Sequence, residues 1–469
     1  MQLISLPDSS PLVTLRILFR TGSAQDPEGK GGAAWMTALQ LASGGSRTRS
    51  NKEILDAFFP LATSVGSQVD KEMIAFSAET HRDNLDAFYE IFRAMLLDPG
   101  WRSDDFQRLR DDAVNYLESG LRAQNDEEFA KEMLYQCIYR DHPYERHNAG
   151  SISSLKTLTL SDLREFYTAH FTRENLTICL AGGYPADFER RIRQDFSCLP
   201  PKARPQQPIA APASGTESNV LFIEKPARGV AISLGFPIGV RRGHPDFPAL
   251  LLATSALGQH RMSSGRLFNR MRQIRGLNYG DYAYIEYFPG GMYSLEPEPN
   301  LARSHQIFQL WIRPVEHHHA HFALRLAIFE LDRLIRHGLD AEEFERTRRF
   351  LPKYSKLLLK TKDAELGYLA DSAFYQIPPY PEYLERTFAQ LTLEQVNAAI
   401  GRHLHTDSLQ VVMVGEDLAA LRDGILANRP SPLEYTTPKP DEILTEDVEV
   451  ANLALNLKAR LMPAEDAFA

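Results

Sequence analysis

An internal repeat constrains the fold of this chain more than any other feature of its sequence. The tripeptide Leu-Thr-Leu opens one segment at Leu158–Leu160 and another at Leu391–Leu393. Later identities follow without a gap: His170 with His403, Leu176 with Leu409, and Gly182 with Gly415. Each copy has the pattern of a helix, a short turn and a strand that is apolar on both faces, as in a covered sheet. The repeat predicts a duplicated fold.

The beginnings of the two copies also match and indicate where the domains lie. Val13–Gly22 resembles Val230–Gly239, and both read as a strand that enters a turn before a long helix. Between the copies, residues 199–208 contain four prolines, which supply no amide hydrogen and favour a linker over a sheet strand. The predicted organisation is a first domain at residues 1–203, a linker at 204–218, a second domain at 219–430 and an extended C-terminal arm at 431–469.

Local signals place helices and strands alternately in both domains. Capping-box patterns begin at Ser50, Asp340 and Thr392. Residues 104–123 and 341–360 have the pattern of long helices, and Pro352 is expected to kink or break the second. Met73–Ala78 reads as a strand. The predicted fold class is α+β, with two homologous domains that are each a mostly antiparallel sheet covered by helices on one face.

Composition excludes some functions. The chain has 469 residues, a formal net charge of -9 and a pI near 5.9, which argues against a nucleic-acid surface. The longest apolar run, Ala249–Leu257, is too short to span a bilayer and reads as a buried helix.

The N-terminus lacks a signal-peptide pattern, so we expect a cytoplasmic protein, or a periplasmic one if a signal was removed. Three cysteines at unrelated spacings, Cys137, Cys179 and Cys198, are expected to be reduced thiols.

One segment has the frame of a metal motif without its ligands. Gly29–Leu39 follows a strand and the turn Gly22–Pro27, and it places Trp35, Ala38 and Leu39 on one helix. The frame resembles the pitrilysin/insulinase family, or inverzincins, whose helix bears H-x-x-E-H. In that family the two His bind zinc and the Glu handles the proton of the attacking water. Trp35 stands at the first His position, Ala38 at the Glu and Leu39 at the second His, which implies a partner subunit and not a self-sufficient enzyme.

A second segment, Ser263–Gly280, resembles the C-domain signature of the same family. The family's Arg and Tyr, seven residues apart, contact the substrate backbone and the oxyanion, and the matching positions are Arg272 and Tyr279. A guanidinium and a phenol fixed in advance stabilise the charge of a tetrahedral intermediate. Gly276 would allow a tight turn between them, while Asn278 departs from the Ala or Gly common at its position. The alternative is that Arg272 is a solvated helix residue and Tyr279 a sheet-face aromatic.

Two other sets of potential ligands give weaker signals. Counting back from Asp141–Tyr144 places Glu118 near the family's third zinc ligand, but one carboxylate cannot hold catalytic zinc, so Glu118 reads as a remnant or a helix-surface residue. His317 and His321 are four residues apart in a His-rich stretch and could share a helix face. No third ligand is visible there, and His residues at the start of a helix tend to be neutral and solvated.

The resemblance covers roughly residues 3–425 and implies half of a clamshell-shaped peptidase. It implies a non-catalytic, substrate-binding subunit that is inactive alone, with no cofactor of its own. Its expected partners are a peptide and a homologous H-x-x-E-H subunit that holds the zinc, with neither nucleic acid nor membrane. One alternative is a non-proteolytic scaffold or peptide-binding subunit of the same fold. Another is an independent metalloenzyme that uses His317 and His321.

Overall fold

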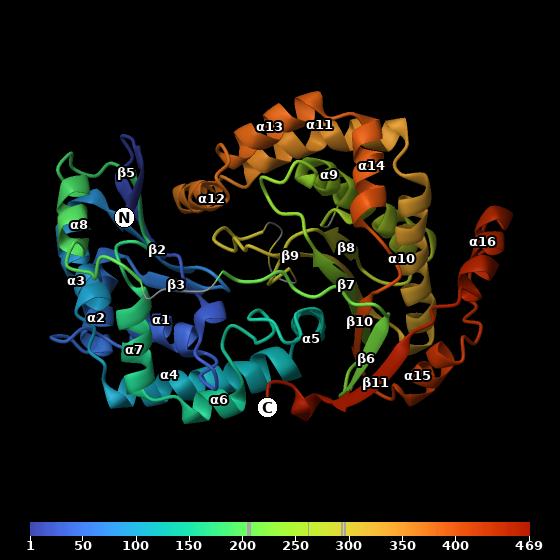
Figure 1. Cartoon of the computed structure of the whole chain (residues 1–469), viewed down its shortest axis with the longest axis horizontal. Coiled ribbons are helices and arrows are strands. Elements are labelled where there is room, and N and C mark those ends of the chain that lie inside the picture. The colour runs from blue at the N-terminus through green and yellow to red at the C-terminus, as the bar shows by residue number, and fades with distance from the viewer. Residues whose placement is uncertain (204–207, 261, 292–293, 295–296) are drawn as a thin grey trace.

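The computed structural model describes residues 1–203, 208–260, 262–291, 294 and 297–469. Each half of the molecule is built on one β-sheet (Figure 1). The first sheet consists, in spatial order, of β1 (Gln2–Pro7), β5 (Leu176–Gly182), β2 (Leu12–Phe19), β4 (Ile74–His81) and β3 (Val65–Val69). The second consists of β11 (Lys458–Pro463), β6 (Asn219–Glu224), β10 (Gln410–Gly415), β7 (Val230–Ile238), β9 (Gln306–Val315) and β8 (Asp281–Tyr284). Residues 204–207 of the predicted linker lie outside the described residues.

The two sheets repeat one topology. The order β6-β10-β7-β9-β8 reproduces β1-β5-β2-β4-β3. In both sheets the first pair is parallel, β1 with β5 and β6 with β10, and the other pairs of the repeat are antiparallel. The predicted α+β fold of two related, mostly antiparallel halves is therefore confirmed.

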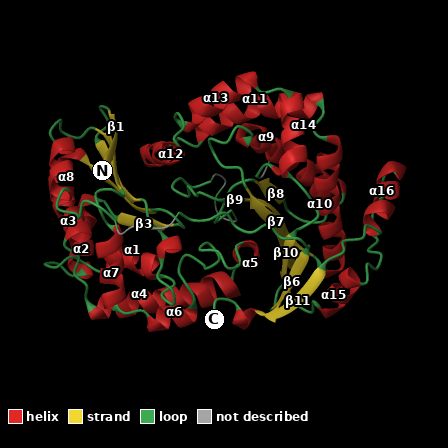
Figure 2. Ribbon diagram, viewed as in Figure 1, coloured by secondary structure: helices red, strands yellow, loops and turns green. Residues whose placement is uncertain are grey.

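Most helices lie on the outer face of each sheet (Figure 2). In the first half these are α1 (Ala33–Ser43), α2 (Asn51–Phe58), α3 (Leu85–Leu97), α4 (Ser103–Asn115), α6 (Ile152–Thr157), α7 (Leu160–His170) and α8 (Phe188–Phe196). In the second half they are α9 (Phe247–Gly258), α10 (His317–His337), α11 (Ala341–Leu357), α13 (Tyr380–Gln390), α14 (Leu393–His403), α15 (Ala419–Leu426) and α16 (Asp441–Ala451). Short helical turns are η1 (Ser23–Gln25), η2 (Phe59–Leu61), η3 (Arg82–Asn84) and η6 (Ala464–Asp466). All three predicted capping boxes form. Among the helices that the structure describes, none combines the length and the apolar character that crossing a membrane requires.

Each half gives one helix to the inner face of the other half's sheet. Helix α5 (Asp126–Ile138), from the first half, packs on β7, β9 and β10 of the second. Helix α12 (Lys362–Tyr375), from the second half, packs on β1, β2 and β5 of the first. Figure 1 shows both helices in the space between the two sheets. The exchange explains why the central strands are apolar on both faces: Leu18 and Ala181 of the first sheet share a buried cluster with Leu366 and Ala370 of α12.

The C-terminal segment differs from the extended arm that the sequence predicted. Residues 441–451 form α16, and β11 extends the second sheet by pairing in parallel with β6. Beyond β11, Phe468 is buried in the first half, and its backbone oxygen accepts a 2.7 Å hydrogen bond from the amide of Ile152. The strand escaped prediction because Lys458–Pro463 is short and ends in a proline, a residue that is uncommon in strands, and its conformation is set by the free backbone groups of β6.

Two helix predictions also need correction. Helix α11 continues past Pro352 to Leu357, so the proline does not end it. The segment predicted as one helix over 104–123 is α4 followed by the π-helix η4 (Tyr116–Ala123). Such wide turns depend on local packing and have no clear sequence signal.

A buried ion pair joins the halves. Arg303, just before β9, donates to Asp70, between β3 and β4, through Nε at 2.7 Å and Nη2 at 2.5 Å. Both side chains are at most 1% exposed. The Arg303 guanidinium also lies 3.5 Å from the ring centroid of Tyr287.

We predict that Arg303→Met lowers the free energy of unfolding by about 3–5 kcal/mol, because it leaves the Asp70 carboxylate buried without its partner. Equilibrium urea unfolding measures the loss. The double variant Asp70→Leu/Arg303→Met should lose less than the single one, since it buries no unpaired charge. A loss below ~1 kcal/mol for Arg303→Met, the size typical of a surface pair, would contradict the prediction.

Candidate functional site

The helix at the predicted metal position is α1. It begins after Gly32, whose φ of 89° lies in the left-handed region. The Asp26 carboxylate caps it by accepting from the amides of Gly32 at 2.6 Å and Ala34 at 2.7 Å. Burial raises the pKa of Asp26 to about 7. The start of the helix is therefore held by hydrogen bonds within the chain.

The side chains at the three motif positions, Trp35, Ala38 and Leu39, have no atoms that coordinate zinc. Ala38 is fully buried, and Trp35 and Leu39 pack against the core of the first half. Trp35 stacks on Tyr116 of η4, with ring centroids 6.1 Å apart, and lies 6.4 Å from the ring of His147. Aromatic packing occupies the position at which the family's first zinc ligand would stand.

The imidazole of His147 lies beside Trp35, and it is held neutral. Its Nδ1 accepts a 3.0 Å hydrogen bond from the amide of Ala149, and its ring lies 5.5 Å from that of Phe468. Burial lowers the pKa of His147 to about 3. Sequence reasoning did not single out this residue, because nothing in its local pattern distinguishes it from a core histidine.

A cavity of about 520 Å³ lies beside Trp35, between the two halves. Its lining includes Glu128 and Glu132 of α5, whereas Glu118 is not part of it. Glu128 pairs with Lys131 at 2.5 Å, and Glu132 accepts from the hydroxyl of Tyr287 at 3.2 Å. Burial raises the pKa of Glu132. Glu128 and Glu132 are thus engaged with neighbouring groups of the chain.

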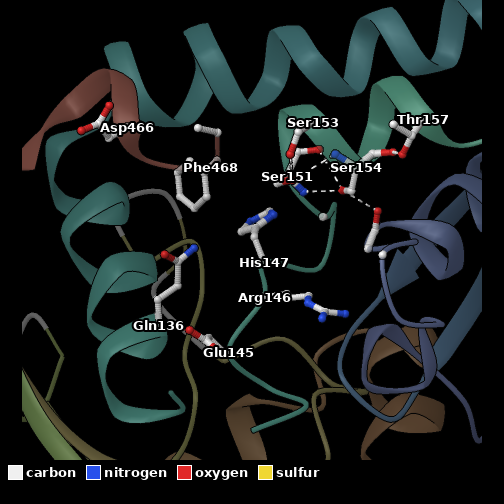
Figure 3. A pocket seen from close by; sticks show the side chains of 14 residues that line it. Gln136, Glu145, Arg146, His147, Ser151, Ser153, Ser154, Thr157, Asp466 and Phe468 are labelled. Carbon is white, nitrogen blue, oxygen red and sulfur yellow. Dashed lines mark hydrogen bonds between the residues drawn. The ribbon is translucent and has the colours of Figure 1, made fainter. Parts of the chain in front are cut away.

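A second cavity, of about 600 Å³, lies on the other side of His147. Figure 3 shows the ring of Phe468 near His147, and Ser151 and Ser154 joined by hydrogen bonds. These two hydroxyls cap α6, and that of Ser154 also donates to the Gly31 oxygen at 2.8 Å. These hydroxyl groups form hydrogen bonds with nearby backbone atoms. The cavity lies where the C-terminal segment contacts the first half.

His317 and His321, the pair considered from the sequence, belong to neither group of potential metal ligands found among the described residues. His317 is hydrogen bonded to the backbone oxygen of Glu416, and burial lowers the pKa of His321 to about 4. Among the described residues, the groups of three potential metal ligands within reach of one another are Glu316, His318 and His319, and His244, Asp246 and His403.

Internal contacts already engage the second of these groups. Both carboxylate oxygens of Asp246 have partners: Arg402 donates at 2.8 Å to Oδ1, and His403 Nε2 lies 2.7 Å from Oδ2. Nδ1 of His244 accepts from the amide of Asp246 at 3.0 Å. The group therefore joins the start of α9 to the end of α14.

The structure places Arg272 and Tyr279 in direct contact. Arg272 lies on the π-helix η5 (Phe268–Ile274), and Tyr279 lies just before β8. The guanidinium carbon is 4.3 Å from the centroid of the Tyr279 ring and 4.8 Å from that of Phe268. Nη1 of Arg272 donates to the backbone oxygen of Tyr279 at 3.0 Å, and Tyr279 is 63% exposed. The pair is preorganised and open to solvent.

The turn between the two residues is built from local contacts. Gly276 has a φ of 69°, the conformation that glycine adopts most readily. Asn278, the departure from the family pattern, donates through Nδ2 to Asp281 Oδ1 at 2.6 Å and to the Arg313 oxygen at 3.1 Å. Asn278 thus ties the turn to β8 and β9.

Arg272 differs from the other arginines of its segment. Arg266 pairs with Glu343, Arg270 with Glu330 and Glu446, and Arg275 with Glu446 and Asp447. Among the described residues, no carboxylate forms an ion pair with Arg272. Its charge is held by two aromatic rings and one carbonyl, so it remains available to an anionic or carbonyl group of a ligand. The ion pairs of Arg270 and Arg275 with Glu446 and Asp447 could not be predicted from the sequence, because α16 lies about 170 residues further along the chain.

Fold and site together define a class: a duplicated α+β peptidase fold without a metal-binding helix. A family model for "Insulinase (Peptidase family M16)" matches residues 3–151, and one for "Peptidase M16 inactive domain" matches residues 157–351. The chain belongs to the pitrilysin/insulinase family and is a non-catalytic member of it.

Similar proteins include zinc proteases and a processing peptidase. An uncharacterized zinc protease of Mycobacterium tuberculosis is 26% identical over 247 residues, which are 51% of this chain and 55% of that relative. The mitochondrial-processing peptidase subunit beta of Saccharomyces cerevisiae is 23% identical over 261 residues, 54% of each chain. The alignments therefore span just over half of these relatives. The crystal structure of a peptidase M16 inactive domain from Pseudomonas fluorescens has a TM-score of 0.77 at 24% identity, covering 89% of this chain and 96% of that one.

We predict that the titration of His147 makes the folded state less stable as the pH is lowered. The folded state keeps this ring neutral down to about pH 3, whereas an unfolded histidine protonates near pH 6.5. The unfolded state therefore binds more protons below about pH 6.5, and stability is lost as the pH falls from there toward 3. Between pH 7 and pH 5 the contribution is about 2 kcal/mol.

His147→Asn tests this prediction, because an amide keeps an acceptor near Ala149 and does not titrate. Urea unfolding of both proteins at pH 7 and pH 5 should show the smaller change in the variant. Identical pH dependence in the two proteins would rule out this role for His147.

Proposed function

We propose that this chain is the substrate-binding, non-catalytic subunit of a heterodimeric zinc metallopeptidase that cleaves peptides. Its partner would be a homologue with H-x-x-E-H, and Arg272 and Tyr279 would complete the partner's active site. The observation that supports this most directly is the guanidinium of Arg272, which forms an ion pair with no described carboxylate and is held against Phe268 and Tyr279 while its neighbours are neutralised. The compartment in which we place the complex is the cytoplasm.

The chemistry divides between the subunits. Zinc on the partner would polarise the scissile carbonyl and supply the activated water. This chain's Tyr279 hydroxyl and Arg272 guanidinium would donate to the oxygen on which negative charge develops. A peptide held along the edge of the partner's sheet would present its backbone to these two donors. Because the pair is ordered by contacts within its own chain, little reorganisation accompanies the reaction.

The test is peptide hydrolysis by the reconstituted complex of this chain with an H-x-x-E-H homologue from the same organism. Tyr279→Phe and Arg272→Ala should each lower kcat by about 10²–10³, the effect of removing one donor to an oxyanion. Gln273→Ala, an exposed position on the same π-helix, is the matched control and should leave kcat unchanged. Gel filtration of each mixture shows whether the complex still forms. Full activity of both variants would support the scaffold role instead.

The isolated, untagged chain provides a second test. We predict no peptide hydrolysis and a zinc content far below stoichiometric, because Trp35, Ala38 and Leu39 offer no ligand atoms to a metal ion. Mass spectrometry of metals after dialysis measures the content. Hydrolysis by this chain alone that a chelator abolishes would overturn the proposed division of labour.

A further inference from the structure

Tyr279 contacts a second guanidinium besides that of Arg272. The guanidinium carbon of Arg313, on β9, lies 5.4 Å from the centroid of the Tyr279 ring. The Arg313 backbone is tied to the same turn, since its amide donates to the Gly280 oxygen at 3.2 Å and its oxygen accepts from Asn278. Two cations therefore contact one exposed phenol ring, and each contact restricts the rotation of that ring.

The position of Arg313 depends on the other half of the molecule. Its Nε donates at 3.0 Å to Oε2 of Glu127, which lies on α5. Glu127 is 4% exposed, and Arg313 is largely shielded from solvent. A shielded charge pair of this kind holds its geometry better than a solvated one, because water competes less for the two groups.

A neighbouring carboxyl group, that of Asp281, does not take the place of Glu127 as the partner of Arg313. Asp281, the first residue of β8, is 1% exposed, and burial raises its pKa to about 8. Its Oδ1 accepts from Asn278 at 2.6 Å. Burial raises the pKa of Glu127 as well, so the 3.0 Å contact of its Oε2 with Nε of Arg313 is what identifies Glu127 as the carboxylate partner.

We propose that Arg313 is a positioning residue for Tyr279, and that Glu127 sets its place by reaching from the first half through α5. The inference rests on the proposed function for its consequence in catalysis, but not for its geometry. An exposed tyrosine has several accessible rotamers, and a ring flanked by Arg272 and Arg313 has fewer. The first half, which has no metal ligands on α1, then still acts on the site in the second half.

The geometric test uses the full chain without a partner. 3-Fluorotyrosine is placed at position 279, and its ¹⁹F resonance is recorded. Arg313→Met should move and narrow the signal, because the ring loses a cationic neighbour and gains rotational freedom while the aliphatic volume of the side chain is kept. Glu127→Gln should change the signal in the same direction, and Arg313→Lys should restore part of the original shift.

Lys225→Ala is the matched control. Lys225 pairs with Asp126, so this variant also removes an ion pair between α5 and the second half, one residue away from Glu127. It should leave the fluorine signal unchanged. A signal that moves equally in Lys225→Ala and Arg313→Met would show a general loosening of α5 and overturn the proposal, as would a signal unchanged in Arg313→Met.

The catalytic test uses the reconstituted complex. Arg313→Met should lower kcat about two- to fivefold with KM unchanged, the scale of one arginine–aromatic contact. A rise in KM at constant kcat would contradict a positioning role. If Tyr279→Phe leaves kcat intact, the proposed function fails, and the fluorine experiment still decides whether Arg313 orders Tyr279.

Discussion

The exchange of α5 and α12 between the halves is the constraint on which the rest of this structure depends. Each sheet has central strands that are apolar on both faces, and its own helices cover only the outer one. The inner face is covered by a helix from the other half. Neither half can therefore bury its sheet alone, and the buried pair of Asp70 and Arg303 joins the same interface. The relative position of the halves follows from core packing.

Loss of the metal ligands has been accommodated by packing. A zinc peptidase of this family has His, Glu and His where this helix has Trp35, Ala38 and Leu39. If only these three residues differed, the site around them would still be polar and half open. Here Trp35 stacks on Tyr116 and meets His147, whose other side is covered by Phe468. Where the family's zinc site requires solvent access, this chain has a partly buried aromatic cluster. The second half shows the opposite, since Arg272 pairs with no carboxylate in the described part of the chain and Tyr279 is exposed.

Much of the fold was predictable because the sequence contains an internal repeat, with one copy in each half. The repeat that begins at Leu158 and Leu391 identified α7 with β5 and α14 with β10, and the sheets confirm one topology for both halves. The candidate pair Arg272 and Tyr279 came from a short motif whose two members are close in sequence. Its supports were out of reach: Glu446 and Asp447 on α16, and Glu127 on α5, are joined to the motif only by long-range packing. Strand β11 was missed for a related reason, since a short, mostly exposed segment becomes a strand only where an open sheet edge supplies hydrogen-bond partners.

The sequence by itself determined the duplicated α+β fold, the missing zinc ligands and the seven-residue spacing of an arginine and a tyrosine. These properties lie in periodicity and in residue identity, which neighbours along the chain define. Only the tertiary structure decided that α5 and α12 each lie on the sheet of the other half and that the C-terminal segment extends the second sheet. It also decided that Arg272, unlike Arg266, Arg270 and Arg275, forms no ion pair with a carboxylate of the described residues. Each of these depends on which distant surfaces meet, and such encounters are selected by burial and charge pairing over the whole chain.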